Sequence, residues 1–439
     1  MSQPIDTLIQ CRWLITMDSK RRVLEHHSIA VKDGKITAIV PNSEAEDLYQ
    51  ANECIKLEQH IALPGLVNTH GHLAMSLLRG YADDYPLHDW LNDHIWPAEG
   101  KFVSHEFVAD GARLAMAEMI RGGTTAFSDN YFFPEAVAEV CAEVGMRGSL
   151  YSPILNFPTA WGSGPEETIA KSCKLIEQYQ EHALVNIGFG PHAPYTVSNE
   201  AFSEIAKQEA KYQCGIMVHL QETQKEVDDS IEQYGQRPTE RLQSLGVMNE
   251  RTQCVHMTAV SDEDISILQA SKSHVVHCPE SNLKLASGFC PTEKLRQAGV
   301  NVSLGTDGAA SNNDLDMLSE MRTASMLAKA VDNNASALNA MDSLAMATID
   351  GAKALNIDSY TGSLEVGKAA DITTVELSAL NALPMYDPVS YLVYTNCSHQ
   401  VSDVWVSGER LLAAGLLQTI DEQALRDNAI EWQSKISAD

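Results

Sequence analysis

Short apolar runs alternate with longer amphipathic stretches along the middle of this 439-residue sequence, and this alternation most restricts its fold. The stretch from Glu106 to Ile120, for example, has the apolar spacing of a helix with one buried side, and Gly122-Gly123 follows it. Parallel strands joined by helices produce such a pattern. Eight runs predict a closed (β/α)8 barrel of the TIM type, and they cover residues 61–69, 124–128, 148–153, 185–190, 215–218, 253–255, 274–277 and 300–304.

The two ends of the chain have a different pattern, in which apolar and polar residues alternate between turns such as Asp33-Gly34 and Ser407-Gly408. This alternation is typical of strands with one buried face. We therefore expect a small β-sandwich domain formed by both chain ends. The expected division is 1–60 for the first part of the sandwich, 61–361 for the barrel, and 362–439 for the second part with a polar C-terminal helix.

Acidic residues outnumber basic ones by 59 to 31, which gives a formal net charge of −28. Such a chain repels phosphate backbones and anionic lipids, and this argues against nucleic-acid and membrane partners. The nine cysteines include no C-x-x-C pair, no run reaches the roughly 18 apolar residues of a membrane helix, and the N-terminus lacks the pattern of a signal peptide. We expect a cytoplasmic protein with reduced thiols and a small-molecule partner.

Residues of metal-binding types directly follow four of the predicted strands. His70 and His72 follow the first run, His219 the fifth, His256 the sixth and Asp307 the eighth. In a (β/α)8 barrel the C-terminal ends of the strands form one rim, where catalytic groups lie. If the first strand continues through the histidine pair, both rings point the same way and can face one metal ion. Imidazoles with a carboxylate suit zinc, although iron and manganese also accept such ligands.

With these residues in this order, the chain resembles the amidohydrolase superfamily, and in particular its methylthioadenosine/S-adenosylhomocysteine deaminase family. The resemblance extends over nearly the whole chain, including Gly367-Lys368-Ala369-Ala370-Asp371 near the C-terminal end. The other motifs that carry it are Pro64-Gly65-Leu66-Val67-Asn68-Thr69-His70-Gly71-His72, Leu78-Arg79-Gly80, Pro191-His192-Ala193-Pro194-Tyr195, His219-Leu220-Gln221-Glu222, His277-Cys278-Pro279 and Gly305-Thr306-Asp307-Gly308.

The resemblance implies one divalent metal ion, usually zinc, with a water completing the site. The residues implied to hold it are His70, His72, His219 and Asp307. Members of the superfamily with two metal ions use a modified lysine at the end of the fourth strand, whereas that strand here ends in Phe189-Gly190-Pro191-His192. We therefore expect one metal ion, with His256 orienting and polarising the water rather than binding the metal.

Two acidic residues are implied to act on the attacking water. In the resembling deaminases the glutamate at the position of Glu222 takes a proton from the water and delivers it to N1 of a purine, so that C6 is attacked and ammonia leaves. Asp307 is implied to accept a hydrogen bond from the same water in addition to binding the metal.

Four further residues match substrate-contacting positions of the family. The Trp90 indole is implied to cover the nucleoside, and the Glu99 carboxylate to bind its ribose, since a carboxylate can accept from both hydroxyls of a cis-diol. His192 is implied to contact the ring or the sugar, with a rigid-loop histidine as the alternative. Arg147 matches a substrate-contacting arginine, although a surface cation beside a strand would give the same pattern. No arginine occurs in residues 152–159, where some relatives carry one, and this disfavours a charged 5′ substituent.

The expected function is metal-dependent hydrolytic deamination of an adenosine derivative. The best match is conversion of 5′-methylthioadenosine to 5′-methylthioinosine, with S-adenosylhomocysteine or adenosine as other candidates. An alternative is a free-base deaminase or triazine hydrolase of the same superfamily, but Glu99 and Trp90 favour a nucleoside because a free base needs no diol clamp. A third alternative is an inactive barrel used as a binding scaffold, against which the complete ligand set, Glu222 and His256 argue. A homo-oligomer is compatible with the sequence.

Overall fold

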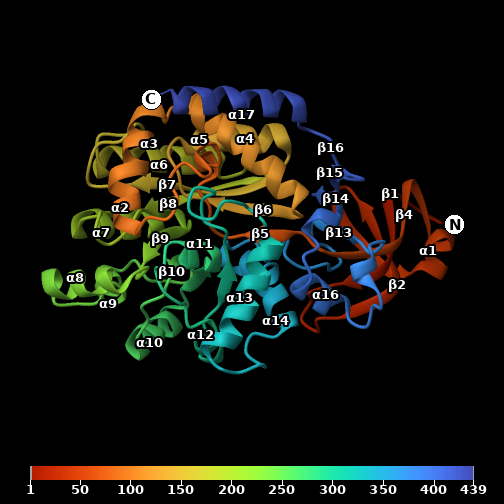
Figure 1. The fold of residues 1–439 in the computed structure, drawn as a ribbon. Helices are drawn as coiled ribbons and strands as arrows, with labels where there is room; N and C mark the ends of the chain where they lie inside the picture. The colour runs from red at the N-terminus through yellow and green to blue at the C-terminus, as the bar shows by residue number, and fades with distance from the viewer. Residues whose placement is uncertain (1, 439) are drawn as a thin grey trace.

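A barrel of parallel strands with a second sheet beside it forms the fold of the computed structural model, which describes residues 2–438 (Figure 1). The barrel strands pair side by side in the order in which they occur in the sequence. They are β5 (Leu66–Asn68), β6 (Thr124–Asp129), β7 (Arg147–Ile154), β8 (Val185–Pro191), β9 (Ile216–Leu220), β10 (Thr252–His256), β11 (His274–His277) and β12 (Val302–Leu304). Each of the eight predicted runs overlaps one of these strands, which confirms the (β/α)8 prediction.

The first and last strands are joined by hydrogen bonds that close the barrel. The Thr69 N–H donates to the Leu304 carbonyl oxygen at 3.0 Å, and the Asp307 N–H donates to the His70 carbonyl oxygen at 3.0 Å. Gly305 permits this close approach, because a Cβ atom there would lie 2.6 Å from the His70 nitrogen. The closure brings two predicted metal-binding residues, His70 and Asp307, next to each other.

Helices surround the barrel, and one group of helices forms an insertion after β5 (Figure 1). The predicted amphipathic helix is α4 (His105–Arg121), which begins where Ser104 accepts a hydrogen bond from the Phe107 N–H. The insertion contains η1 (Leu73–Leu78), α2 (Leu87–Asp89), the π-helix η2 (Trp90–Ile95) and α3 (Trp96–Phe102). The other helices of the barrel are α5 (Pro134–Val144), α6 (Pro165–Tyr179), α7 (Asn199–Tyr212), α8 (Gln224–Tyr234), α9 (Pro238–Ser244), α10 (Asp262–Ser271), α11 (Pro279–Lys284), α12 (Thr292–Gln297), α13 (Met317–Val331), α14 (Ala340–Met346) and α15 (Ile349–Ala354).

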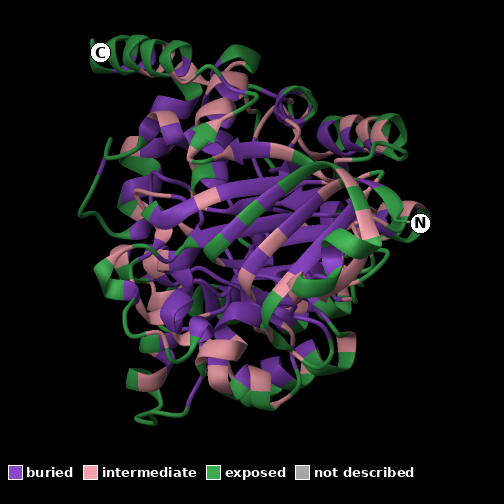
Figure 2. Ribbon diagram, turned by 90° about the vertical axis from the view of Figure 1, so that its right-hand side faces the viewer, coloured by how far each residue is buried: buried purple, intermediate pink, exposed green. Residues whose placement is uncertain are grey.

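Both chain ends contribute to the second sheet, as predicted. Its strand order is β16-β15-β14-β13-β4-β1-β2-β3, and the two ends meet where β13 pairs antiparallel with β4. Its elements are β1 (Gln3–Ile15), β2 (Val23–Lys32), β3 (Lys35–Pro41), α1 (Asn42–Leu48), β4 (Tyr49–Pro64), β13 (Ile372–Glu376), β14 (Val401–Val406), β15 (Glu409–Ala413) and β16 (Leu416–Leu417). Figure 2 shows that long stretches of the strands are buried.

The expected strand 61–69 is divided at Gly65, so the predicted boundary between residues 60 and 61 is wrong. Residues 61–64 complete β4 and pair with β1 and β13 in the second sheet, and the barrel begins with β5. A Cβ atom at Gly65 would overlap the Thr125 side chain, so only glycine fits where the chain passes into the barrel. Because β5 ends at Asn68, His70 and His72 lie beyond the strand rather than on it.

The C-terminal helix, α17 (Glu422–Ser437), lies against the barrel rather than the second sheet (Figure 1). Trp432 packs edge-on against Phe107 of α4 with ring centroids 5.2 Å apart, and its indole N–H donates to Asp110 at 2.9 Å. The helix α16 (Pro388–Tyr394) also packs on the barrel, against α13 and α14, and it lies between the short helices η3 (Leu380–Ala382) and η4 (Ser398–Gln400). Residues 362–438 are therefore shared between the second sheet and the outside of the barrel.

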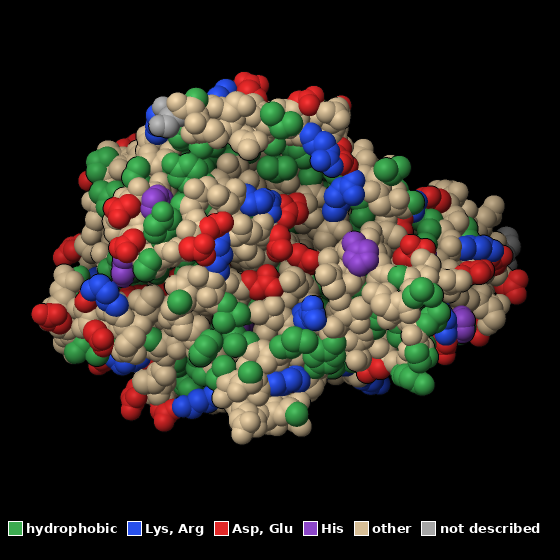
Figure 3. Space-filling view, viewed as in Figure 1, with side chains coloured by type: hydrophobic (Ala, Val, Ile, Leu, Met, Phe, Trp, Pro, Cys, Tyr) green, Lys and Arg blue, Asp and Glu red, His purple; other side chains and the backbone are tan. Residues whose placement is uncertain are grey.

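Acidic and basic side chains are interspersed over the face of the molecule drawn in Figure 3. This face carries no large continuous area of Lys and Arg. None of the helices within residues 2–438 is long and apolar enough to cross a membrane.

Candidate active site

A pocket at the C-terminal ends of the barrel strands contains most of the predicted site residues. Its walls come from the strand ends and from the insertion after β5. The lining residues are His72, Met75, Leu87, Trp90, Leu91, Ile95, Trp96, Glu99, Asn130, Tyr131, Phe132, Pro153, Leu155, His192, Tyr195, His219, Glu222, His256, Leu285 and Asp307.

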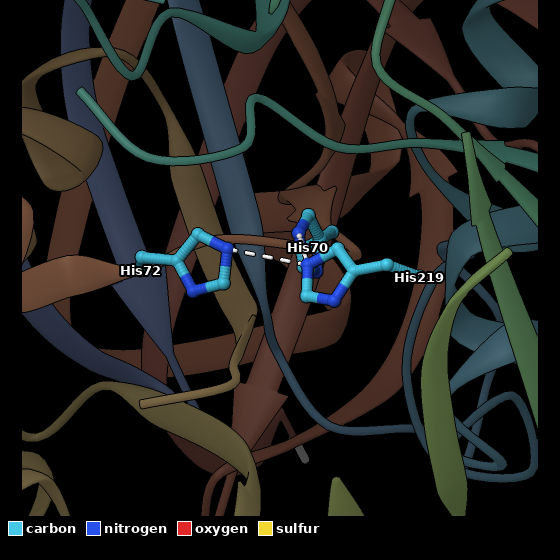
Figure 4. Close-up of side chains that lie close together, drawn as sticks. All are labelled: His70, His72 and His219. Carbon is cyan, nitrogen blue, oxygen red and sulfur yellow. Dashed lines mark hydrogen bonds between the residues drawn. The ribbon is translucent and has the colours of Figure 1, made fainter. Parts of the chain in front are cut away.

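The three predicted histidine ligands come together at this pocket (Figure 4). The His219 Nε2 atom lies 3.2 Å from His70 Nε2 and 3.4 Å from His72 Nε2. Asp307 Oδ1 lies 3.3 Å from Nε2 of both His70 and His72. Ligand atoms at the corners of a tetrahedron around zinc, with bonds of about 2.0–2.1 Å, are separated by about 3.3–3.4 Å. The spacing of these side chains therefore fits one tetrahedral metal ion such as zinc.

Backbone carbonyl groups hold two of the histidine rings from the side opposite the metal position. His72 Nδ1 lies 2.7 Å from the carbonyl oxygen of Asn130, and His219 Nδ1 lies 2.7 Å from that of His192. A carbonyl oxygen only accepts hydrogen bonds, so each Nδ1 carries the proton of the neutral ring. Each Nε2 then presents its lone pair to a metal ion, which is the arrangement typical of histidine ligands.

Asp307 is fixed by three hydrogen-bond donors, two of which bind the carboxylate oxygen Oδ2. Its Oδ2 atom accepts hydrogen bonds from the hydroxyl groups of Ser281 at 2.7 Å and Ser311 at 3.1 Å, and its Oδ1 atom accepts from the Gly308 N–H at 2.8 Å. These hydrogen bonds orient the carboxylate so that Oδ1 faces His70 and His72 before a metal ion binds.

His256 borders the four predicted ligands. Its ring stacks on His219 with centroids 5.5 Å apart, and its Nδ1 atom lies 3.0 Å from the side-chain nitrogen of Asn282. With the Asn282 amide assigned in this orientation, its nitrogen donates to Nδ1 and the proton of the neutral ring lies on Nε2. In this tautomer the Nε2–H can donate to a water, which is the role predicted for His256, although His256 also lies close enough to His70 and Asp307 to share a metal ion with them.

Glu222 is buried beside the predicted metal position. Its Oε1 atom accepts a hydrogen bond from the Ser287 hydroxyl at 3.0 Å, and its Oε2 atom lies 3.8 Å from His256 Nε2. The Glu226 carboxylate accepts from the Glu222 N–H at 3.0 Å and so holds its backbone. Burial raises the pKa of Glu222 above its usual value. A carboxyl group with a raised pKa gains and loses a proton more readily near neutral pH, as proton transfer requires.

The predicted substrate contacts Trp90, Glu99 and His192 also line this pocket. The Trp90 indole N–H donates to the Ala82 carbonyl oxygen at 3.1 Å, which fixes the ring in the pocket wall. Glu99 is buried and accepts a hydrogen bond from the Tyr131 hydroxyl at 2.6 Å. Burial raises the pKa of Glu99 to about 7.

Arg147 lies outside the pocket, so its interpretation as a substrate contact is wrong. It is the first residue of β7 and therefore lies at the N-terminal end of the strand, away from the catalytic rim. Its guanidinium is buried against Asp371, with Nη2 3.1 Å from Oδ2, and donates to Ser407 Oγ at 2.9 Å. Arg147 thus joins the barrel to the second sheet.

Several residues of the site were absent from the sequence-based prediction, among them Tyr131, Asn282 and Ser287. Tyr131 lies two residues after β6, so its place at the rim was a usable signal. Asn282 lies three residues after the motif His277-Cys278-Pro279, on α11. Ser287 lies in a loop with no strand or motif beside it, and we find no sequence signal that indicates its contact with Glu222.

Comparison with known proteins agrees with this geometry. The model of the Amidohydrolase family matches residues 61–411. A 5-methylthioadenosine/S-adenosylhomocysteine deaminase from Saccharophagus degradans is 50% identical over 435 residues, which cover 99% of this chain and 98% of the relative. A protein of the same name from Teredinibacter turnerae is 46% identical over 434 residues, covering 99% and 98% of the two chains.

Solved structures show the same architecture with zinc. An adenosine deaminase from Xanthomonas campestris with bound zinc aligns with a TM-score of 0.99 at 45% identity and covers 100% of both chains. Atrazine chlorohydrolase from Arthrobacter aurescens TC1, complexed with zinc, aligns with a TM-score of 0.91 at 25% identity and covers 97% of this chain and 100% of the other. The chain described here belongs to the amidohydrolase family.

Proposed function

We propose that this protein is a zinc-dependent hydrolase that replaces the 6-amino group of adenosine derivatives by oxygen, with 5′-methylthioadenosine as its preferred substrate. One observation carries the proposal: the pocket that Glu222 and Glu99 line is also lined by His72, His219 and Asp307, and the buried His70 lies against these ligands. The metal-binding side chains and Glu222 suit the attack of a water on a ring carbon. The Glu99 carboxylate suits the binding of the ribose hydroxyls. The names of the related deaminases support the same reaction class.

The side chains of the pocket account for the proton transfers. A zinc ion bound by the four ligands would lower the pKa of a water toward about 7. Glu222 removes a proton from the attacking water and passes it to N1 of the purine, while the His256 N–H and Asp307 orient that water. The oxygen of the water forms a bond to C6 as this proton reaches N1. When the bond between C6 and the amino nitrogen then breaks, the second proton of the former water moves to this nitrogen, and ammonia leaves as the 6-oxo product forms.

The composition of the pocket favours an uncharged 5′ substituent. Most of its lining is apolar, and no Lys or Arg is found among the described lining residues. The amino-acid tail of S-adenosylhomocysteine would lose its hydration without gaining a cationic partner for its carboxylate, which is unfavourable in a buried site. A methylthio group has no such cost.

A spectrophotometric assay over five compounds tests the proposal. The purified protein is given 5′-methylthioadenosine, adenosine, S-adenosylhomocysteine, guanine and a chlorotriazine, and the change in ultraviolet absorbance is followed. We expect the highest kcat/KM for 5′-methylthioadenosine and no turnover of guanine or the triazine. Turnover of guanine or the triazine without any nucleoside would replace the proposal by the free-base alternative, and a protein that is inactive on all five would indicate a binding scaffold.

We also propose that the chain forms a homo-oligomer in the cytoplasm. Residues 377–399 contain one charged residue, Asp387, in a chain with 21% charged residues, and three large side chains of this segment are exposed: Leu380 (88%), Leu383 (65%) and Tyr386 (89%). Two copies with a charge of −28 each repel one another, so a segment with a single charged residue and exposed apolar side chains is the favourable place for self-association. Light scattering after gel filtration should give a dimer or larger species that Leu380→Asp dissociates, and a monomeric wild-type protein would contradict this proposal.

A further inference from the structure

The Glu99 carboxylate is buried in the pocket wall. Glu99 is 9% exposed, and it forms no ion pair with any of residues 2–438. Among residues 2–438, the Tyr131 hydroxyl alone donates a hydrogen bond to this side chain, to Oε1 at 2.6 Å. A carboxylate offers about four acceptor positions, and Oε2, which accepts no hydrogen bond from residues 2–438, is not fully enclosed by protein atoms, so a ligand in the pocket can reach it. A bound ligand is therefore expected to bring hydroxyl donors to Oε2.

Tyr131 belongs to the same short segment that fixes a metal ligand. The carbonyl oxygen of the preceding residue, Asn130, lies 2.7 Å from His72 Nδ1, and the Asn130 N–H donates to the Gly71 carbonyl oxygen at 3.0 Å. Both residues follow β6, and both line the pocket. The segment thus links the metal-binding His72 to Glu99 through backbone and side-chain hydrogen bonds.

We propose that Tyr131 is a positioning residue that selects substrates carrying a vicinal diol. Its hydroxyl occupies Oε1 of Glu99 and leaves Oε2 for the 2′ and 3′ hydroxyls of a ribose. Because the carboxylate is already oriented in the free protein, a diol binds without the entropic cost of ordering Glu99. A nucleoside without these hydroxyls gains nothing from the arrangement. The inference rests on the proposed nucleoside specificity and adds the residue that enforces it.

A comparison of two substrates that differ only in the diol distinguishes the positioning of Glu99 by Tyr131 from a purely structural role of Tyr131. The kcat and KM of the wild-type protein and of Tyr131→Phe are measured with adenosine and 2′,3′-dideoxyadenosine. We expect Tyr131→Phe to lower kcat/KM for adenosine about tenfold or more, mainly through KM, because a hydrogen bond to a charged group is lost. The value for the dideoxy substrate should stay within about twofold, since that substrate makes no use of the bond.

Two further variants serve as controls. In a Glu99→Gln background, Tyr131→Phe should add less than about a twofold effect, because the two residues act as a unit. Tyr151→Phe removes the hydroxyl of another buried tyrosine, which contacts Gln253 away from the pocket, and should not distinguish the two substrates. Melting temperature and zinc content are measured for every variant, so that a change in substrate selectivity is separated from a loss of stability or of the metal.

The outcomes distinguish the inference from the proposed function. Equal loss on both substrates, or no loss on adenosine, would overturn the role of Tyr131 while leaving the deaminase proposal intact. If the wild-type protein deaminates no nucleoside, the proposed function itself fails, and the inference fails with it.

Discussion

Arg147→Met tests whether this residue joins the two sheets, as its surroundings indicate, or contacts the substrate. The guanidinium lies against the Asp371 carboxylate, and its Nη1 donates to the Ala183 carbonyl oxygen at 3.0 Å. Both charged residues are at most 3% exposed. Methionine has a similar length but no charge, so the substitution leaves Asp371 buried with the Thr361 hydroxyl and the Ser407 N–H as its donors, at 2.6 and 2.7 Å.

The expected loss of stability follows from this uncompensated charge. Removing one partner of a buried ion pair costs about 3–5 kcal/mol. An unfolding entropy of about 2.1 cal/mol/K per residue gives about 0.9 kcal/mol/K for a chain of this length. The Tm should therefore fall by about 3–5 °C. Adding Asp371→Asn should restore part of this loss, because the second change removes the unpaired charge.

Thermal denaturation and steady-state kinetics are measured on the same preparations. Lys225→Met serves as the control, since it breaks an exposed ion pair with Asp229 that should contribute at most about 1 kcal/mol. We expect KM for 5′-methylthioadenosine to stay within about twofold of wild type in Arg147→Met, because the residue lies outside the pocket. A tenfold rise in KM with an unchanged Tm would refute this reasoning and restore the substrate-contact interpretation.

Three further predictions concern the diol, the metal and pH. Glu99→Gln should weaken turnover of ribosides far more than that of any free base, because it removes a charge-assisted acceptor contributing about 1.5–3 kcal/mol; equal losses would argue against a ribose clamp. Elemental analysis of the active protein should give close to one zinc per chain, and a chelated sample should regain full activity with one equivalent; a requirement for two would mean that His256 or another residue binds a second ion. Burial lowers the pKa of His274, whose Nδ1 accepts from Asn301 at 2.9 Å, so the unfolded state binds a proton more readily than the folded one. The free energy of unfolding therefore keeps its full value above about pH 6.5 and decreases as the pH falls below that value, because protonation of His274 favours the unfolded state. Between pH 7.5 and 5.5 the wild-type Tm should thus decrease more than that of His274→Gln, and parallel decreases would contradict this assignment.

The barrel and the metal-binding residues were predictable because both depend on local sequence. A strand of apolar residues followed by a histidine or aspartate is visible within a few positions, as at His219 and Asp307, and barrel geometry places all strand ends on one rim. The insertion after β5 needed the family resemblance, since Trp90 and Glu99 follow no strand and their roles have no local signature.

Features that depend on distant partners were missed or misread. Arg147 precedes the predicted run 148–153, so its place at the N-terminal end of the strand was implied by the sequence, but its partner Asp371 lies 224 positions away. The division at Gly65 is likewise set by pairing of β4 with β13, far along the chain. The contact between Tyr131 and Glu99 joins two segments 32 residues apart whose relation appears only in the folded structure.

The central claim is that Glu222 transfers protons in a metal-dependent deamination without binding the metal. Turnover of 5′-methylthioadenosine, zinc content and Tm are measured on one preparation of Glu222→Gln, which keeps the size and polarity of the side chain but cannot transfer protons. We predict that zinc content and Tm stay near wild type while kcat falls about 10²–10⁴-fold, the range for a positioned acid or base. Loss of zinc would show that Glu222 is a ligand or supports one, and near-normal turnover would remove it from the mechanism.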